Sequence, residues 1–357
     1  MNGQTGFWRL FGDSTFAADL AHDARGGVME SLLPIALRAF TERREPSQAR
    51  RRPTQRRRPE IRWPEAVLVF DTETTTDPSQ RLLFGSWRSY RWTPSAALVC
   101  MGGGLFSADE LPTRDPAAHA CLREYTEMHR ADAAPRGDPE LVLSSRTEFV
   151  NRVFYPLAYK ARSLVVGFNL PFDLSRLALW AGEARGEYRG GFSLVLWGDQ
   201  DPQSGRVREN RFRPRIDVKV LDSKRAFVRF TRPVNPDRDD LIPEGSVDGR
   251  PERGYAFPGH FLDARTLAFA LTNERYSLAR ACQAFGVEHG KAAVSAHGEI
   301  TTAYIDYARR DVQATGELLA VLRAEFDRHP IALPPTKAYS PASFAKAYLQ
   351  AMGIPPW

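Results

Sequence analysis

The chain has 357 residues, enough for one large domain or two smaller ones, and its 43% apolar and 26% charged residues are typical of a soluble globular protein. It has no apolar stretch of the roughly 18 residues that a membrane span needs, and its amino terminus lacks the layout of a secretory signal. Three widely spaced cysteines match neither a zinc site nor a disulfide framework, so we expect a reduced, cytoplasmic protein.

The net charge of +6 comes from one short segment near the amino terminus. Residues 42–62 hold nine of the 49 basic residues and three of the 43 acidic ones, so the rest of the chain is neutral. This Arg/Pro/Gln-rich segment has no apolar face and is predicted to be a solvated linker. Two interpretations stay open: a simple spacer, or a linker that also binds phosphates. Residues 1–41, which precede it, are expected to form a small helical segment.

The pattern from Trp63 onward is that of an α/β domain, expected over residues 63–329. Short apolar runs bounded by turn residues predict its strands at 66–70, 82–92, 96–106, 163–168, 192–197, 216–221, 226–231 and 260–263. Helical spacing and polar composition predict helices within 107–159 and 265–328, and over 172–181 and 341–352.

The expected fold is a mixed β-sheet flanked by helices, with residues 183–260 inserted as a β-hairpin region rich in loops. A C-terminal helical segment, residues 330–357, follows the domain. Ser340 and Pro341 are expected to cap and begin its helix, and Gly353 to end it.

Four acidic residues each stand near the end or start of a predicted element. Asp71 and Glu73 lie two apart at the end of a strand, so their side chains should share one face. Asp173 begins the helix after the strand 163–168, and Asp311 lies one helical turn after Tyr307. Each pattern alone is common on protein surfaces and helix ends. Their occurrence in this order, each on the expected element, indicates a site.

The chemistry of this set favours magnesium or manganese. Four oxygen donors with no nearby Cys or His suit a hard divalent cation and argue against zinc. Two such ions, about 4 Å apart, can stabilise the attacking and leaving oxygens of a phosphoryl transfer. The sequence therefore predicts a site for two Mg²⁺ or Mn²⁺ ions.

Three segments of the chain resemble the exonuclease motifs of the DEDD superfamily. They are Val69-Phe70-Asp71-Thr72-Glu73-Thr74, Gly167-Phe168-Asn169-Leu170-Pro171-Phe172-Asp173 and Tyr307-Ala308-Arg309-Arg310-Asp311. Tyrosine in the third segment is similar to the DEDDy branch, and the second segment resembles the proofreading domain of family B DNA polymerases, including phage and protein-primed types. The resemblance spans about residues 65–325. It implies an RNase H-like fold and 3′→5′ removal of nucleotides from a single-stranded DNA end.

The resemblance also implies a role for each residue of the set. Asp71 would bridge both ions, while Glu73 and Asp311 would complete the tighter site and Asp173 would hold the second ion, through water. Tyr307 would hold the attacking water. A phenol with a pKa near 10 is a poor base at pH 7, so Tyr307 is expected to orient that water rather than deprotonate it.

Further positions match residues that bind the terminal nucleotides in this family. By resemblance they are Thr74, Asn169, Phe172, Ser277, Leu278 and Lys291. Two of these identifications stay open, because Ser277 and Leu278 also fit an ordinary helix start and Lys291 also fits a surface lysine. Asp263 follows a strand and is expected to cap the next helix rather than to bind an ion.

Alternative interpretations remain at this point. The chain could be the exonuclease part of a longer polymerase, with a polymerase module in the same chain or in a partner. It could also be a nucleic-acid-binding module that has lost catalysis, or an endonuclease on the same fold. The presence of all four carboxylates and the tyrosine favours an enzyme over a binding module. The Tyr307–Asp311 and Asn169–Asp173 patterns argue against an endonuclease, and the resemblance to polymerase domains favours DNA over RNA. No sequence pattern predicts the oligomeric state.

Overall fold

A computed structural model describes residues 63–130, 140–200, 207–208, 210, 212–231, 257–288 and 298–354. The predicted helical segment 1–41, the linker 42–62 and Lys291 lie outside these residues. Within them, no helix is long and apolar enough to cross a membrane.

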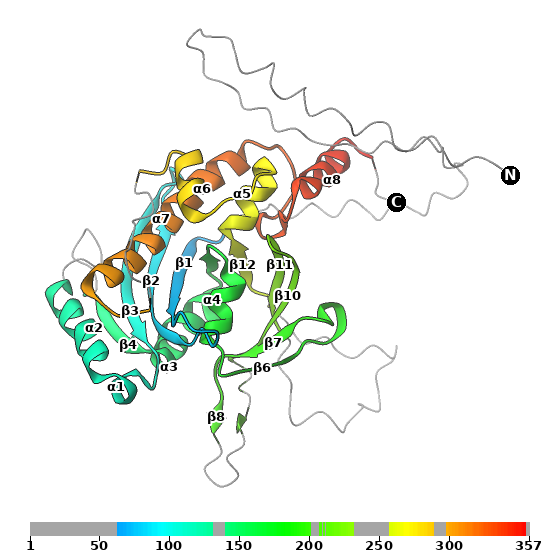
Figure 1. The fold of residues 1–357 in the computed structure, drawn as a ribbon. Helices are drawn as coiled ribbons and strands as arrows, with labels where there is room; N and C mark the ends of the chain where they lie inside the picture. The colour runs from blue at the N-terminus through cyan, green and yellow to red at the C-terminus, as the bar shows by residue number, and fades with distance from the viewer. Residues whose placement is uncertain are drawn as a thin grey trace, which may run out of the picture. The chain divides into compact units, whose positions relative to one another are not determined.

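A six-stranded mixed sheet forms the centre of the described domain (Figure 1). Strands β1, β2 and β3 pair antiparallel in sequence order. Strand β5 adds in parallel to the other side of β1, β12 adds in parallel to β5, and β4 adds in parallel to β3. The strands span Ala66–Thr74 (β1), Leu82–Trp92 (β2), Leu98–Ser107 (β3), Val142–Ser145 (β4), Leu164–Gly167 (β5) and His260–Asp263 (β12).

Helices cover both faces of this sheet. The α-helices among the described residues are α1 (Leu111–Arg114), α2 (Pro116–Met128), α3 (Arg146–Phe149), α4 (Leu170–Leu177), α5 (Ala264–Thr272), α6 (Leu278–Ala284), α7 (Thr302–Asp327) and α8 (Pro341–Ala351), the last of which packs on α5. Two π-helical turns, Val150–Phe154 and Pro156–Lys160, continue α3. The predicted mixed α/β class is therefore confirmed.

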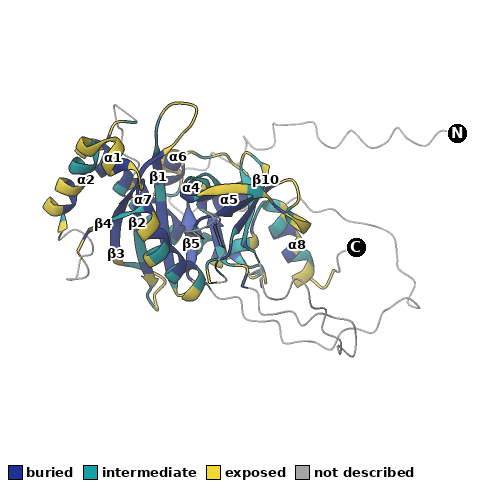
Figure 2. Ribbon diagram, turned by 90° about the horizontal axis from the view of Figure 1, so that it is seen from below, coloured by how far each residue is buried: buried dark blue, intermediate teal, exposed yellow. Residues whose placement is uncertain are grey.

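Alternation along β1 determines which helix each residue meets. Phe70 packs against Phe149 of α3 and Phe154, with ring centroids 6.0 Å apart in both pairs. Glu73 faces the opposite side, where Tyr304 of α7 donates a hydrogen bond to it. Successive residues of a strand point to opposite faces, so α3 and α7 lie on opposite sides of the sheet. Figure 2 shows the central strands largely buried between these layers.

A second, four-stranded sheet occupies the region predicted as a β-hairpin insertion. Its strand order is β11-β10-β7-β6, all antiparallel, and a short pair β8 (Asp199–Gln200) and β9 (Val207–Arg208) extends beyond it. Within this region, β10 and β11 form a hairpin. The strands of the sheet are Trp180–Glu183 (β6), Phe192–Val195 (β7), Ile216–Asp222 (β10) and Arg225–Phe230 (β11).

Three sequence-based predictions of local structure were wrong. The helix expected over 172–181 runs from Leu170 to Leu177, because the Leu179 N–H bonds to the Val195 carbonyl at 2.7 Å and begins the pairing of β6 with β7. Strand β4 lies in a region expected to be helical. The side chain of Ser340 makes no capping hydrogen bond, although α8 begins at Pro341 as expected.

Candidate active site

A pocket of about 570 Å³ lies between β1, α6 and α7. It brings together four of the five residues predicted for catalysis, which are Asp71, Glu73, Tyr307 and Asp311. Asp71 and Glu73 reach it from one face of β1, as their spacing predicts. Tyr307 and Asp311 reach it from one face of α7, because residues four apart on a helix lie one above the other.

Asp173 is placed apart from this pocket lining. It lies in the first turn of α4, 2% exposed, and Thr72 donates to its Oδ1 through both its backbone N–H (3.2 Å) and its hydroxyl (2.7 Å). Thr72 points to the face of β1 opposite to Asp71 and Glu73. Burial raises the pKa of Asp173 well above its usual range and the nearby carboxylates Asp263 and Glu73 add to this, while the Thr72 hydrogen bonds oppose it.

A second tyrosine, Tyr304, which was not predicted as a site residue, contacts the site. The Tyr304 hydroxyl donates a 2.5 Å hydrogen bond to Oε2 of Glu73, and the Tyr304 ring is 1% exposed. Burial raises the pKa of the phenol of Tyr304 and that of Tyr307, and adjacent carboxylates raise both further. Both residues are therefore neutral hydrogen-bond donors at neutral pH.

The donor chemistry of the site fits a hard divalent cation, although the carboxylates do not form a ready-made cage. In the described part of the chain, no three His, Cys, Asp or Glu side chains lie close enough to hold one ion. Glu73 and Asp173 are instead hydrogen-bonded to hydroxyl groups. The metal ligands that the pocket offers are carboxylate oxygens, and the charges of Asp71, Glu73 and Asp311 all raise the pKa of Tyr307. A cation would offset these negative charges.

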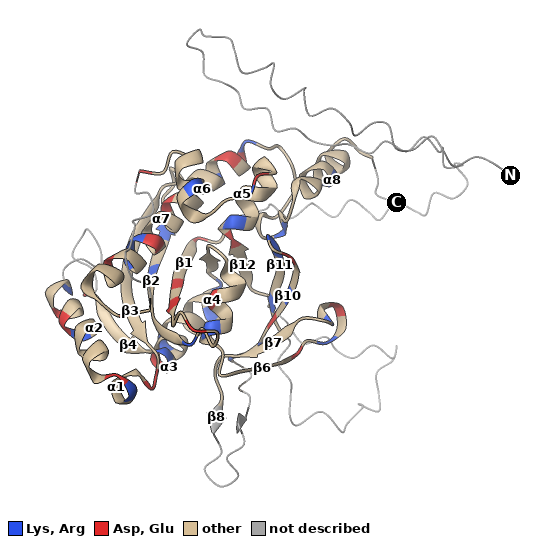
Figure 3. Ribbon diagram, viewed as in Figure 1, with Lys and Arg blue, Asp and Glu red and all other residues tan. Residues whose placement is uncertain are grey.

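The wall of the pocket beyond the carboxylates is basic and aromatic. Figure 3 shows acidic positions on β1 and basic positions on α5 and α6. Six further residues line this wall and were not predicted as site residues from the sequence: Phe168, Arg265, Arg275, Tyr276, Arg280 and Thr315. Basic and aromatic residues alternate around Ser277, a pattern that can indicate nucleic-acid binding. The arginines of residues 42–62 are much denser, so that segment was the more obvious candidate for binding phosphates.

The residues predicted to bind nucleotides are only partly brought to this pocket. Ser277 and Leu278 line it, and Ser277 also caps α6 by accepting from the Arg280 N–H at 3.3 Å. Phe172 lies outside the pocket, and the centroid of its ring is 4.8 Å from Cζ of Arg176. Thr74 ends β1 and is half-buried.

Asn169 forms the left-handed turn that starts α4. Its φ is 89°, a conformation that Asn adopts more readily than most residues. Asp263 accepts hydrogen bonds from the backbone N–H groups of Arg265, Thr266 and Asn169. The prediction that Asp263 caps the following helix is confirmed, and the same carboxylate also holds the turn before Asp173. Burial raises the pKa of Asp263 to about 6, against the effect of these hydrogen bonds.

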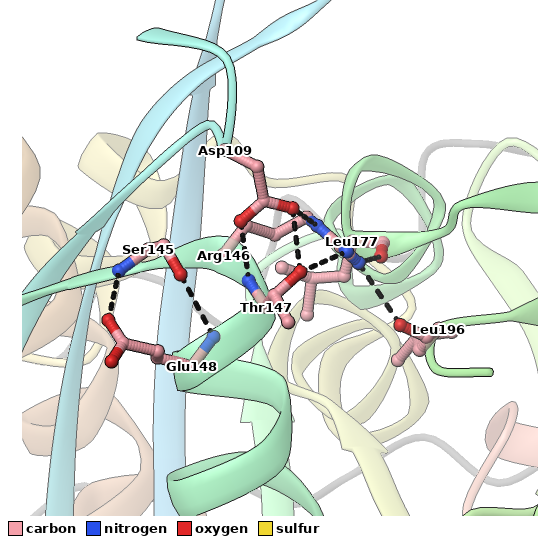
Figure 4. A network of polar contacts seen from close by, with 7 residues as sticks. All are labelled: Asp109, Ser145, Arg146, Thr147, Glu148, Leu177 and Leu196. Atoms are coloured by element: carbon pink, nitrogen blue, oxygen red, sulfur yellow. Dashed lines mark hydrogen bonds and ion pairs between the residues drawn. The ribbon is translucent and has the colours of Figure 1, made fainter. Parts of the chain in front are cut away.

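The far end of α4 is held by a buried arginine (Figure 4). Arg146, 6% exposed, donates to the carbonyl oxygens of Leu177 (2.8 Å) and Leu196 (3.1 Å), to Asp109 (2.9 Å) and to Thr147 (2.8 Å). Leu177 is the last residue of α4, so Arg146 binds the carbonyl end of the helix that carries Asp173. Burial tends to raise the pKa of Asp109, but hydrogen bonds from Thr147 and the charge of Arg146 outweigh it, so the pKa is lowered.

No protein-family model matches the chain, and no curated protein sequence is significantly similar to it. The function therefore has to be inferred from the chemistry of the site.

Proposed function

We propose that the chain is a metal-dependent 3′→5′ exonuclease on an RNase H-like fold, which hydrolyses single-stranded DNA from its 3′ end and releases nucleoside monophosphates. One observation carries this proposal. A single pocket combines the carboxylates Asp71, Glu73 and Asp311 with Tyr307, and its wall bears arginines and aromatic rings. Carboxylates suit the chemistry of phosphodiester hydrolysis, whereas arginines and aromatic rings suit the binding of a polynucleotide.

The strand order supports the RNase H-like part of the proposal. An antiparallel unit β1–β2–β3 continues into parallel strands β5 and β12 on the other side of β1. The candidate site then lies where β1 and the parallel strands end, which is where polar residues of parallel strands gather.

The carboxylates would hold the ions through oxygen donors. Two bound Mg²⁺ or Mn²⁺ ions would supply positive charge for the transition state and would acidify the attacking water. Asp71, Glu73 and Asp311 surround the pocket, whereas Asp173 approaches from α4. Tyr307, kept protonated by burial and by its acidic neighbours, would orient the attacking water through its hydroxyl.

The basic and aromatic wall would hold the strand. Arg265, Arg275 and Arg280 would bind phosphates, which are recognised through charge and paired N–H donors. Phe168 and Tyr276 would stack on bases, an interaction that every base can make and that is therefore independent of sequence. The proposed enzyme should accordingly cut strands of different sequence.

The decisive experiment uses a 3′-labelled single strand with Mn²⁺ or Mg²⁺. Release of labelled mononucleotides supports the proposal, provided that Asp71→Ala abolishes release and still binds DNA. A circular single strand of the same sequence should resist. Cutting of the circle would refute the exonuclease assignment in favour of an endonuclease, and undiminished release by Asp71→Ala would refute the metal role.

One observation favours a second candidate, a nucleic-acid-binding module without catalysis. Among the described residues, the carboxylates are not gathered into a group of three that could hold an ion. This candidate predicts DNA binding that divalent ions do not change, and no release of nucleotides. The same assay therefore separates the two functions.

A further inference from the structure

The middle residue of the sequence Asp71-Thr72-Glu73 faces away from its two neighbours. Asp71 and Glu73 line the pocket, while Thr72 bonds to Asp173 on the α4 side of the sheet. The three residues therefore present a carboxylate, a hydroxyl and a carboxylate, and the hydroxyl donates a hydrogen bond to a third acid, Asp173. This arrangement follows directly from the two-residue repeat of a β-strand.

On the other face of the sheet, the Tyr304 hydroxyl donates a hydrogen bond to Glu73, as the Thr72 hydroxyl does to Asp173. The Tyr304 hydroxyl lies 2.5 Å from Oε2 of Glu73, a length typical of hydrogen bonds to an ionised acceptor. The Tyr304 ring packs edge-to-face on Phe84 of β2, with centroids 5.4 Å apart, and its backbone N–H donates to the capping hydroxyl of Thr301. Both the ring and the backbone of Tyr304 are thus fixed, so its hydroxyl can hold Glu73 in one position.

Asp173 is confined in a comparable way. Two Thr72 donors converge on its Oδ1, at 2.7 Å and 3.2 Å. Its Oδ2 lies above Gly167, where a Cβ would come within 3.3 Å of it. The carboxylate therefore has a fixed orientation set by a hydroxyl on one oxygen and by the absence of a side chain at 167 beneath the other.

We propose that Tyr304 and Thr72 are positioning residues that orient Glu73 and Asp173 for divalent metal binding, one from each face of β1. This inference rests on the proposed function, because it concerns the same ions. Groups that hydrogen-bond to metal ligands fix ligand geometry, and their loss typically weakens metal affinity by about 10- to 100-fold. A tyrosine or threonine that served only to fill the core would not have this effect.

The test measures Mn²⁺ binding by the full chain directly, from the loss of the free-ion electron paramagnetic resonance signal during titration. Tyr304→Phe should raise the dissociation constant for Mn²⁺ by about 10-fold or more. Tyr125→Phe is the matched control. Tyr125 is also 1% exposed and also donates a 2.5 Å hydrogen bond to a carboxylate, that of Asp306, outside the pocket. The Tyr125→Phe variant should lose about as much stability as Tyr304→Phe and keep the wild-type affinity for Mn²⁺.

A second pair of variants keeps the test valid if Tyr304→Phe fails to fold. Thr72→Val removes the hydroxyl at nearly constant shape and should weaken Mn²⁺ binding, whereas Thr72→Ser restores the hydroxyl and should recover most of the affinity. Affinities of Tyr304→Phe and Thr72→Val within about twofold of the wild type would overturn the positioning role.

The wild type and Asp71→Asn separate this inference from the proposed function. Mn²⁺ binding that Asp71→Asn abolishes, but that Tyr304→Phe and Thr72→Val retain, would overturn the positioning role and leave the proposed function standing. Absence of Mn²⁺ binding by the wild type would overturn both.

Discussion

Replacement of Arg146 by methionine should destabilise the protein strongly, because this side chain is buried and makes four hydrogen bonds (Figure 4). Methionine fills a similar volume and donates nothing. The carbonyl groups of Leu177 and Leu196 would lose this donor, and each buried acceptor left unsatisfied costs about 1–3 kcal/mol. The ion pair with Asp109 adds only about 1 kcal/mol at most, since the Asp109 side chain is 37% exposed.

The free energy of unfolding should therefore fall by about 3–5 kcal/mol, a large part of the roughly 5–15 kcal/mol that stabilises a typical domain. Equilibrium urea unfolding, followed by tryptophan fluorescence, measures the loss. Arg114→Met is the control, because Arg114 pairs with Glu110 at 2.8 Å, close to the 2.9 Å between Arg146 and Asp109, but on the surface. That variant should lose less than about 1 kcal/mol. If Arg146→Met were no less stable than this control, the reasoning from buried carbonyl groups would be refuted.

Four further results are expected. Because the folded-state pKa of Asp109 is lowered, its contribution to stability should be full at neutral pH and lost as pH falls below about 4, so unfolding curves of wild type and Asp109→Asn should converge in acid. Gly85→Ala should cost roughly 1–3 kcal/mol or more in thermal or urea unfolding, since a Cβ there would overlap an aromatic ring of β3. Arg275→Gln with Arg280→Gln should reduce the slope of log binding constant against log salt for a single strand by about 1.4. Asp173→Asn should raise stability in the presence of a chelator by about 0.5–2 kcal/mol, because it removes a buried charge and keeps an acceptor for its hydroxyl partner; a less stable variant would contradict this.

Much of the sheet could be predicted from sequence because its signals are local. Alternation and apolar runs located β1, β2 and β5, and turn residues located the hairpin between β2 and β3. Strand β4 was not predicted, because its four residues, Val142–Ser145, show no alternation of apolar and polar side chains and are held in place by pairing with β3. The end of α4 was also predicted wrongly, because it depends on a hydrogen bond from Leu179 to Val195, which lies 16 positions further along the chain.

In the candidate site too, contacts between residues close in sequence could be predicted, whereas contacts between distant residues could not. The side chains that share a face with a neighbour two or four positions away, Asp71 with Glu73 and Tyr307 with Asp311, were placed together by spacing alone. Tyr304 was overlooked because a buried tyrosine on an amphipathic helix is indistinguishable in sequence from an ordinary core residue. Its contact with Glu73 spans 231 positions and exists only once α7 packs on β1.

Several residues around the candidate site are in states that are unfavourable for folding. Three acids, Glu73, Asp173 and Asp311, are at most 8% exposed, and Asn169 holds a left-handed backbone conformation beside them. The burial of Glu73 and Asp173 opposes folding, and a hydroxyl donor offsets it in each case: Tyr304 for Glu73 and Thr72 for Asp173. The Asp263 carboxylate accepts a hydrogen bond from the Asn169 N–H and so holds the left-handed turn. A buried acid costs free energy unless it is paired, and replacement of a buried ion pair by apolar residues is often neutral or stabilising. Acids this buried at or beside a pocket open to solvent are candidates for a functional role, and a bound cation would offset their charge.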